Sequence, residues 1–297
     1  MAKRDWKVYN EHLVREVFLI FDLNSVNKEP ERTKKVGRPP EYSKELMTQF
    51  AIIRHYMKLP YRQMEGFLRV MQEPFGLERI PDHSTLHERE QGMDLDNLLT
   101  KVKVNENYNP DKPTTIAVDS TGIKVTNDGE WIKKKWKVKR KGFLKIHIAV
   151  DIETNEIVAI EITNDKCHDN VVFDKLIDDS KENRNVKKAL GDGAYDSKDN
   201  FNKLRKLKIE PGIKVRKNSS KKAGGSLTRK KVVIEQLGDY DKWKERVGYG
   251  MRWVAESMFS CYKRRFGEFV RAIKFENMIR EILLNCLVQN LIMRARL

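Results

Sequence analysis

Cysteine is scarce in this chain of 297 residues, and its three copies, Cys167, Cys261 and Cys286, are far apart. An odd number of separated cysteines without a paired-cysteine motif argues against a disulfide framework and against a structural zinc site. The pattern is instead typical of a protein from a reducing compartment.

Long apolar segments are absent as well. The N-terminal sequence MAKRDWKVYN contains no apolar core of a signal peptide. The most apolar stretch, residues 282–293, is interrupted by Asn285, Gln289 and Asn290 and is too short to span a bilayer. These features predict a soluble intracellular protein.

Acidic residues are outnumbered by basic ones. The 43 Asp and Glu residues against 59 Lys and Arg residues give a formal net charge of +16 at pH 7. Such an excess is unusual for an enzyme of small metabolites and indicates a polyanionic partner. A membrane surface is also anionic, but no lipidation motif or basic amphipathic anchor accompanies the charge.

Proline and turn residues divide the chain into three predicted parts. Residues 1–42 contain a short apolar helix and then a basic linker, which Pro39 and Pro40 keep extended. Arg38 in this linker is a candidate DNA contact, because an extended Gly-Arg-Pro tract can lie along a minor groove. A plain linker fits the same composition. Residues 43–105 form the second part and residues 111–297 the third.

The second part is expected to be a helical domain. Ser43 is a candidate N-cap for a helix through Met57, and apolar residues at helical spacing predict another helix over residues 61–70. A third helix begins near residue 84, capped by Asp82 or Ser84. This outline is typical of a helix-turn-helix unit, whose recognition helix contacts DNA through its first turns. The candidate contacts are Ser84, Thr85, His87 and Arg89, and a purely structural three-helix domain is the alternative.

The third part alternates strand and helix signals. Residues 114–118 predict a buried strand that ends at Asp119, and residues 189–191 predict another that leads to Asp192. Between them lie a predicted hairpin (145–150 and 156–162) and a predicted helix (169–180). Asp196 or Ser197 is expected to cap the next helix, and residues 208–215 are a possible further strand. We therefore predict a mixed α/β sheet with flanking helices.

Near the C-terminus, four polar residues recur at helical spacing. At 100° per residue, Tyr249, Arg252, Glu256 and Lys263 project within about 60° of one another around a helix axis. The apolar residues fall on the opposite side: Val254, Met258, Phe259, Cys261, Tyr262 and Phe266. A solvated Arg252–Glu256 ion pair on an amphipathic helix is the simpler interpretation. The alternative is a carboxylate that holds a metal beside an anionic polymer.

Asp119, Asp192 and Glu256 together favour a metal site. Three converging carboxylates raise one another's pKa unless a cation lies between them, and oxygen ligands favour Mg²⁺, with Mn²⁺ as a substitute. Two such ions can activate a water or a 3′-hydroxyl on one side of a phosphodiester and stabilise the leaving oxygen on the other.

These motifs resemble the DDE-type transposases of bacterial and archaeal insertion sequences, in the group with a Tyr-x2-Arg-x3-Glu-x6-Lys signature. Tyr249, Arg252, Glu256 and Lys263 match that signature, and Asp119 and Asp192 match the two aspartate motifs. The resemblance implies a ribonuclease-H-like catalytic domain over residues 111–297 and two divalent metal ions. It also implies that Asp119, Asp192 and Glu256 are the catalytic metal ligands, with Tyr249, Arg252 and Lys263 on the DNA backbone.

The same resemblance implies double-stranded DNA partners, namely terminal inverted repeats and target DNA, and a homodimer or larger synaptic complex in the prokaryotic cytoplasm, at the nucleoid. The expected activity is cleavage of element ends and joining of the freed 3′-hydroxyl to target DNA. Only 63 residues separate Asp192 from Glu256, so a large insertion domain is not expected there. An endonuclease without strand transfer and a catalytically silent DNA-binding derivative are the alternatives.

Two basic tracts accompany the acidic motifs. Residues 131–145 contain eight Lys or Arg and no acid, and Trp136 and Lys145 are candidate DNA contacts because cations neutralise phosphates and aromatics stack on bases. A basic hairpin whose tryptophans cover the core is the alternative. Residues 214–231 carry eight more cations and are expected to form a flexible loop. His147 is expected to have a hydrogen-bonding or structural role.

Overall fold

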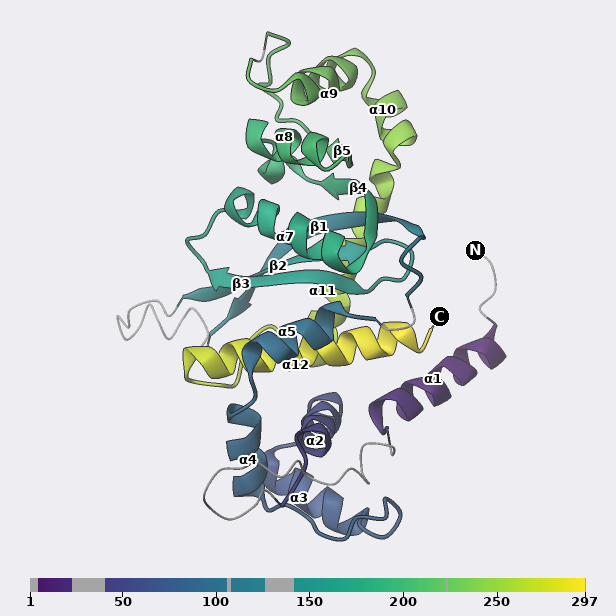
Figure 1. Cartoon of the computed structure of the whole chain (residues 1–297), viewed down its shortest axis with the longest axis vertical. Coiled ribbons are helices and arrows are strands. Elements are labelled where there is room, and N and C mark those ends of the chain that lie inside the picture. Colours follow the sequence, from purple (N-terminus) through teal and green to yellow (C-terminus); the bar gives the residue numbers. More distant parts are fainter. Residues whose placement is uncertain (1–4, 23–40, 106–107, 126–141, 223, 297) are drawn as a thin grey trace, which may run out of the picture. The chain divides into compact units, whose positions relative to one another are not determined.

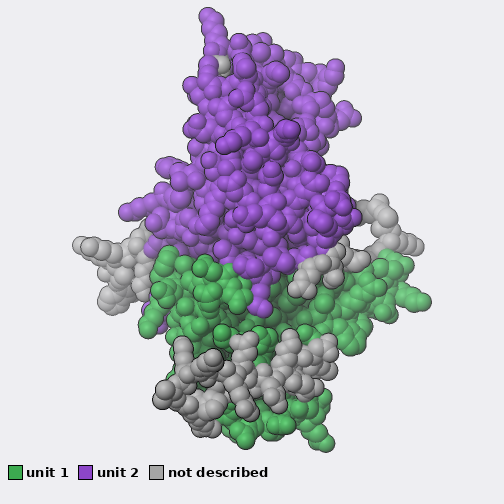
Figure 2. Space-filling model, viewed as in Figure 1, with its two compact units in different colours: residues 1–98, 274–297 green, residues 99–273 purple. Residues whose placement is uncertain are grey.

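The computed structural model describes residues 5–22, 41–105, 108–125, 142–222 and 224–296. The chain divides into two compact units, which Figure 2 colours separately. Unit 1 comprises residues 1–98 and 274–297, and unit 2 comprises residues 99–273.

Unit 2 is built on a five-stranded mixed sheet with the strand order β3-β2-β1-β4-β5 (Figure 1). The strands are β1 (Pro113–Lys124), β2 (Phe143–Asp151), β3 (Ile157–Asn164), β4 (Asn185–Gly191) and β5 (Glu210–Ile213). β1, β2 and β3 pair antiparallel, whereas β4 pairs parallel with both β1 and β5. This arrangement confirms the predicted mixed sheet of an α/β fold.

Helices flank this sheet. The helices of unit 2 are α7 (Asp169–Asn183), α8 (Lys198–Lys206), α9 (Leu227–Gly238), α10 (Tyr240–Val247) and α11 (Trp253–Phe266), with short 3₁₀ turns η2 (Gly193–Tyr195) and η3 (Tyr249–Arg252). α7 packs on β2 and β3, and α11 packs on β1 and β2. Ile116, Ala117 and Val118 are all fully buried, which indicates that β1 is covered on both faces.

Unit 1 is helical. It contains α1 (Trp6–Ile20), α2 (Lys44–Met57), α3 (Tyr61–Val70), α4 (His83–Gln91) and α12 (Phe275–Arg294), while α5 (Leu95–Lys103) crosses the boundary between the units. The Ser43 hydroxyl accepts a hydrogen bond from the Leu46 amide at 3.1 Å, so the predicted start of α2 is confirmed. α3 also has its predicted bounds.

α12 packs against α1 and α2 and therefore groups with the N-terminal helices. Asn285, Gln289 and Asn290, the polar residues of the most apolar stretch, are buried in it, and Asn285 Oδ1 lies 2.7 Å from His55 Nδ1. Within the described ranges, no helix combines the length and the apolar character needed to cross a membrane.

Two predicted element boundaries are wrong, and one of two alternative caps is confirmed. β1 continues past Asp119 to Lys124, because its polar residues still pair with β2 and Ile123 is buried. Of the two predicted caps of α8, Ser197 is the observed one, since its hydroxyl accepts from the Asn200 amide at 3.1 Å. The expected loop over residues 214–231 ends at Ser226, which caps α9.

A buried ionic cluster fixes α4 in unit 1. Glu90 of α4 accepts a hydrogen bond from Arg54 Nε at 2.8 Å and one from the Tyr61 hydroxyl at 3.0 Å, and His55 Nε2 lies 3.3 Å from its carboxylate. Burial alone would raise the pKa of Glu90, but His55 and Arg54 outweigh burial and lower this pKa to about 2. The carboxylate is therefore more stable ionised in the folded chain than in the unfolded chain.

This cluster predicts an acid-dependent loss of stability. Because the folded pKa of Glu90 lies below its ordinary value, its stabilisation is complete above about pH 4.5 and is lost as the pH falls through about 2. Glu90→Gln should lower the free energy of unfolding by about 3 kcal/mol at pH 7, and the deficit should shrink steadily below about pH 4.5. Urea titrations from pH 3 to pH 7 measure it, and a pH-independent deficit would contradict the assignment.

Candidate active site

Asp119 and Asp192 are brought together by the parallel pairing of β1 and β4. In that ladder Ile116 pairs with Ala189 and Ala117 with Leu190, so Asp119 and Asp192 lie two residues farther along their strands. Neighbouring strands are separated by about 4.8 Å. Asp192 directly follows β4, and its carboxylate accepts a hydrogen bond from the Ala194 amide at 2.8 Å, which fixes it as the cap of η2.

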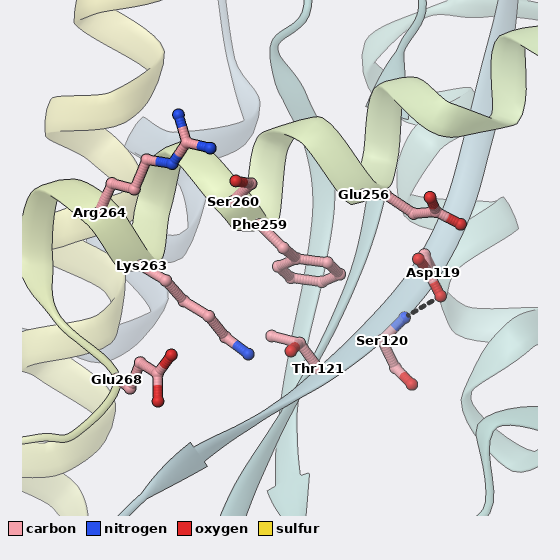
Figure 3. Close-up of a pocket in the computed structure, with 9 residues that line it drawn as sticks. All are labelled: Asp119, Ser120, Thr121, Glu256, Phe259, Ser260, Lys263, Arg264 and Glu268. Carbon is pink, nitrogen blue, oxygen red and sulfur yellow. Dashed lines mark hydrogen bonds between the residues drawn. The ribbon is translucent and has the colours of Figure 1, made fainter.

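An open groove of about 650 Å³ lies between β1 and α11. It is lined by Asp119, Ser120, Thr121, Glu256, Phe259, Ser260, Lys263, Arg264 and Glu268. Figure 3 shows the carboxylates of Asp119 and Glu256 at one end of the groove, with the Lys263 amine extending toward Thr121. The groove therefore combines two of the three predicted carboxylates with a predicted DNA-binding lysine.

Arg252 connects the acidic side chains. Its Nη2 donates a hydrogen bond to Glu256 Oε1, and its Nη1 lies 3.8 Å from Asp119 Oδ2. The Arg252–Glu256 pair is the ion pair expected from their spacing in the sequence. One guanidinium thus offsets part of the negative charge of two carboxylates from different elements.

The electrostatics show that Asp119 is poorly accommodated as an anion. Burial is the largest of the effects that raise its pKa to about 6; the charges of Asp192 and Glu256 act in the same direction, whereas the Ser120 amide and Arg252 act in the opposite direction. Asp119 is therefore close enough to both other carboxylates to be repelled by them. A divalent cation bound to these oxygens would relieve that repulsion.

The donor chemistry of these residues fits a hard divalent cation, since all three supply carboxylate oxygens. Their arrangement is nonetheless open. The described part of the chain contains no group of three His, Cys, Asp or Glu side chains gathered closely enough to hold a metal ion. Glu256 pairs with Arg252, so a cation and Arg252 would compete for the same carboxylate.

Tyr249 does not lie on a common helical strip with Glu256 and Lys263. Residues 249–252 form the 3₁₀ turn η3, entered through Gly248 with φ of 70°, and only then does α11 begin. Tyr249 is buried with its ring centroid 5.1 Å from that of Trp243, and the Arg252 guanidinium lies 6.0 Å from the tyrosine ring. Burial raises the pKa of Tyr249 to about 12. Cys261, expected on the core side, is exposed.

Lys145 contacts an acid that the sequence interpretation missed. Its Nζ lies 2.8 Å from Asp169 Oδ1, and the buried His147 places Nδ1 3.2 Å from the same oxygen. Burial alone would raise the pKa of Asp169, but His147, Lys145 and Ser120 hold this pKa far below its usual range. Ser120 thus contacts both acids: its side chain bonds to Asp169 and its amide donates to Asp119 Oδ1 at 2.9 Å.

The candidate contacts of the helix-turn-helix region lie in unit 1, whereas the carboxylates lie in unit 2. Ser84 and Thr85 bond to the capping Asp82: the Ser84 hydroxyl at 2.9 Å and the Thr85 amide at 2.7 Å. His87 and Arg89 are exposed on the same helix. Their contact with DNA stays a prediction. The remaining two candidates, Arg38 and Trp136, lie outside the described residues.

Comparisons relate this chain to known transposases. Two family models, both described as a transposase DDE domain, match residues 110–291 and residues 15–128. Among solved structures, the chain is similar to a piggyBac transposase synaptic complex with hairpin DNA, with 10% identity and a TM-score of 0.44. That similarity covers 96% of this chain and 75% of the other.

The raised pKa of Asp119 predicts that a neutral side chain at this position stabilises the fold. Because the folded pKa of Asp119 lies above its ordinary value of 3.8, its contribution to stability is lost as the pH rises through about 6. Asp119→Asn should therefore raise the free energy of unfolding at pH 7 by up to about 3 kcal/mol, with no gain below about pH 4. Urea unfolding in a metal chelator measures this gain.

The matched control is Asp178→Asn, which removes a surface carboxylate that lies 2.6 Å from Lys203 Nζ. It should leave stability at pH 7 unchanged or slightly lower. If Asp119→Asn is less stable than the unaltered protein at pH 7, ionised Asp119 does not destabilise the folded chain.

Proposed function

Because the chain belongs to the transposase DDE domain family, and is thus a DNA transposase and polynucleotidyl transferase, we propose that Asp119, Asp192 and Glu256 cut the ends of a mobile DNA element. The observation that carries this proposal is the mutual placement of these carboxylates. Two come from adjacent strands, and the third lines the same groove as Asp119. The raised pKa of Asp119 supports a catalytic role, because such shifts are common at functional sites.

Proteins of this family generally use divalent metal ions, and the proposed ligands here are Asp119, Asp192 and Glu256. Two Mg²⁺ ions, replaceable by Mn²⁺, would supply Lewis acidity at the phosphate and at the attacking oxygen. The support for this choice is the all-oxygen donor set and the repulsion at Asp119. Glu256 would have to exchange Arg252 for the metal.

The cations of the groove are proposed to hold the DNA backbone. Lys263 extends into the groove (Figure 3), and Arg264 lines it from the same helix. Arg252 would bind a phosphate when it leaves Glu256, and Tyr249 would fix the guanidinium through its ring. Binding of an anionic substrate thus releases a carboxylate by removing the cation that pairs with it.

The proposed reaction has two steps of the same kind. Water attacks the phosphorus at the element end, an oxygen–phosphorus bond forms and another breaks, and a 3′-hydroxyl leaves. That hydroxyl then attacks a target phosphodiester in line and displaces the target strand's 3′-oxygen. Both ends must be cut together, so a dimer or larger synaptic complex is proposed.

A supercoiled plasmid with the native terminal repeats, incubated with protein and Mg²⁺ or Mn²⁺, tests the function. Excision with joined product supports transposition. Nicking without joining supports an endonuclease instead, and binding without cleavage supports a silent DNA-binding derivative.

Substitution of the carboxylates tests the site. Asp192→Ala and Glu256→Gln should each reduce cleavage by roughly a thousandfold or more while end binding persists, because chemistry and backbone binding use different groups. Both should also weaken Mn²⁺ binding measured by calorimetry, a readout independent of activity.

The control is Glu268→Gln, an exposed acid that lines the same groove and lies 3.4 Å from Lys124 Nζ. It should retain cleavage and Mn²⁺ affinity. Unchanged cleavage in either Asp192→Ala or Glu256→Gln would overturn the assignment of that residue.

A further inference from the structure

A basic segment follows β5 directly. Residues 214–222, named here the basic segment, contain five exposed cations: Lys214, Arg216, Lys217, Lys221 and Lys222. No acid occurs from residue 214 to residue 231. Among the described residues, Lys217, Lys221 and Lys222 have no carboxylate partner. Their charges are therefore available to a polyanion.

The backbone of the basic segment is fixed at its start. Three consecutive amides are hydrogen-bonded: Lys214 N to Gly191 O at 3.1 Å, Val215 N to Gln236 Oε1 at 3.1 Å, and Arg216 N to Asp196 Oδ2 at 2.9 Å. Gly191 immediately precedes Asp192. The segment thus continues the sheet alongside the proposed catalytic aspartate.

Among these acceptors, the Asp196 carboxylate has the largest number of hydrogen bonds. Its side chain is fully buried and accepts from Arg229 Nε at 2.6 Å, from Arg229 Nη2 at 2.8 Å and from the Ser219 hydroxyl at 3.4 Å. A buried carboxylate is tolerated only when its oxygens are this fully hydrogen-bonded. Asp196 therefore connects η2, the basic segment and α9 at one point.

A second hydrogen bond joins the basic segment to the start of η2. Arg216 Nε donates to the Gly193 carbonyl at 3.3 Å, one residue after Asp192. The loop from Asp192 to Asp196 is consequently held to the basic segment near both of its ends. A displacement of the basic segment would displace Asp192 as well.

We propose that the basic segment binds the DNA backbone next to Asp192. We further propose that Asp196 is a positioning residue that holds the segment at a fixed position relative to Asp192. This inference rests on the proposed function, since it names the DNA contact on the Asp192 side of that site. The fixed backbone limits the entropy lost when phosphates bind, so the lysines contribute affinity while Asp196 contributes alignment. Arg229 pairs with Asp196 and does not contact the DNA.

The lysines and Asp196 have separable roles, and two sets of variants test them. Lys217→Ala, Lys221→Ala and Lys222→Ala combined should weaken binding of terminal-repeat duplex at least tenfold in 0.1 M salt. The slope of log affinity against log salt should fall by about 2 to 3, because each lost phosphate contact removes about 0.9.

Asp196→Asn should leave the salt slope of duplex binding unchanged, because every cation of the basic segment remains. It should lower the cleavage rate at saturating DNA at least tenfold and speed hydrogen exchange of the Arg216 amide. Gln236→Met loosens the segment from α9 without touching residues 192–196 and should reproduce both effects. Asp178→Asn, the surface acid paired with Lys203, should change neither.

The outcomes separate this inference from the proposed function. If the unaltered protein does not cleave terminal-repeat DNA, the proposed function fails. If it cleaves, and Asp196→Asn and Gln236→Met cleave at the same rate despite faster exchange, the positioning role of Asp196 is wrong. An unchanged salt slope in the triple lysine variant would overturn the DNA contact. If Asp196→Asn does not fold, the cleavage rate of Gln236→Met decides whether the position of the basic segment matters for cleavage.

Discussion

The parallel pairing of β1 with β4 is the constraint on which the site depends. β1 is antiparallel to β2 on one side and parallel to β4 on the other, so its residues are held from both edges. This double pairing keeps Asp119 beside Asp192 although both are anionic and Asp119 is desolvated. The apolar burial of Ile116, Ala117 and Val118 supplies the free energy that offsets the repulsion.

In both units, the role of an acid is related to the number of hydrogen-bond donors around it. Where an acid has a structural role, as in Glu90 and Asp196, it is buried and surrounded by hydrogen-bond donors. Where an acid is proposed for chemistry, as in Asp119, its donors are fewer and its pKa rises. A fully satisfied carboxylate stabilises the fold, whereas an incompletely satisfied one keeps its affinity for a cation.

Local signals predicted much of the fold. The Ser43 cap, the bounds of α2 and α3, the β2–β3 hairpin and the position of Asp192 after β4 follow from neighbouring residues. Contacts between distant segments escaped prediction. β1 extends past Asp119 because β2 pairs with it, and Asp196 bonds to Arg229 instead of capping α8. The 3₁₀ turn at Tyr249 was not predicted, because the helical projection assumes the same rotation about the axis at every residue.

The grouping of α12 with the N-terminal helices has a consequence for biosynthesis. Unit 2 is inserted in the chain between the two segments of unit 1. On the ribosome α1 to α4 emerge first, but α2 lacks one of its packing partners until α12, with Asn285 beside His55, has been translated. Unit 2 can complete its sheet earlier. Translation products that stop before α12 would carry the acidic residues without a finished unit 1, so completion of unit 1 is tied to synthesis of the whole described chain.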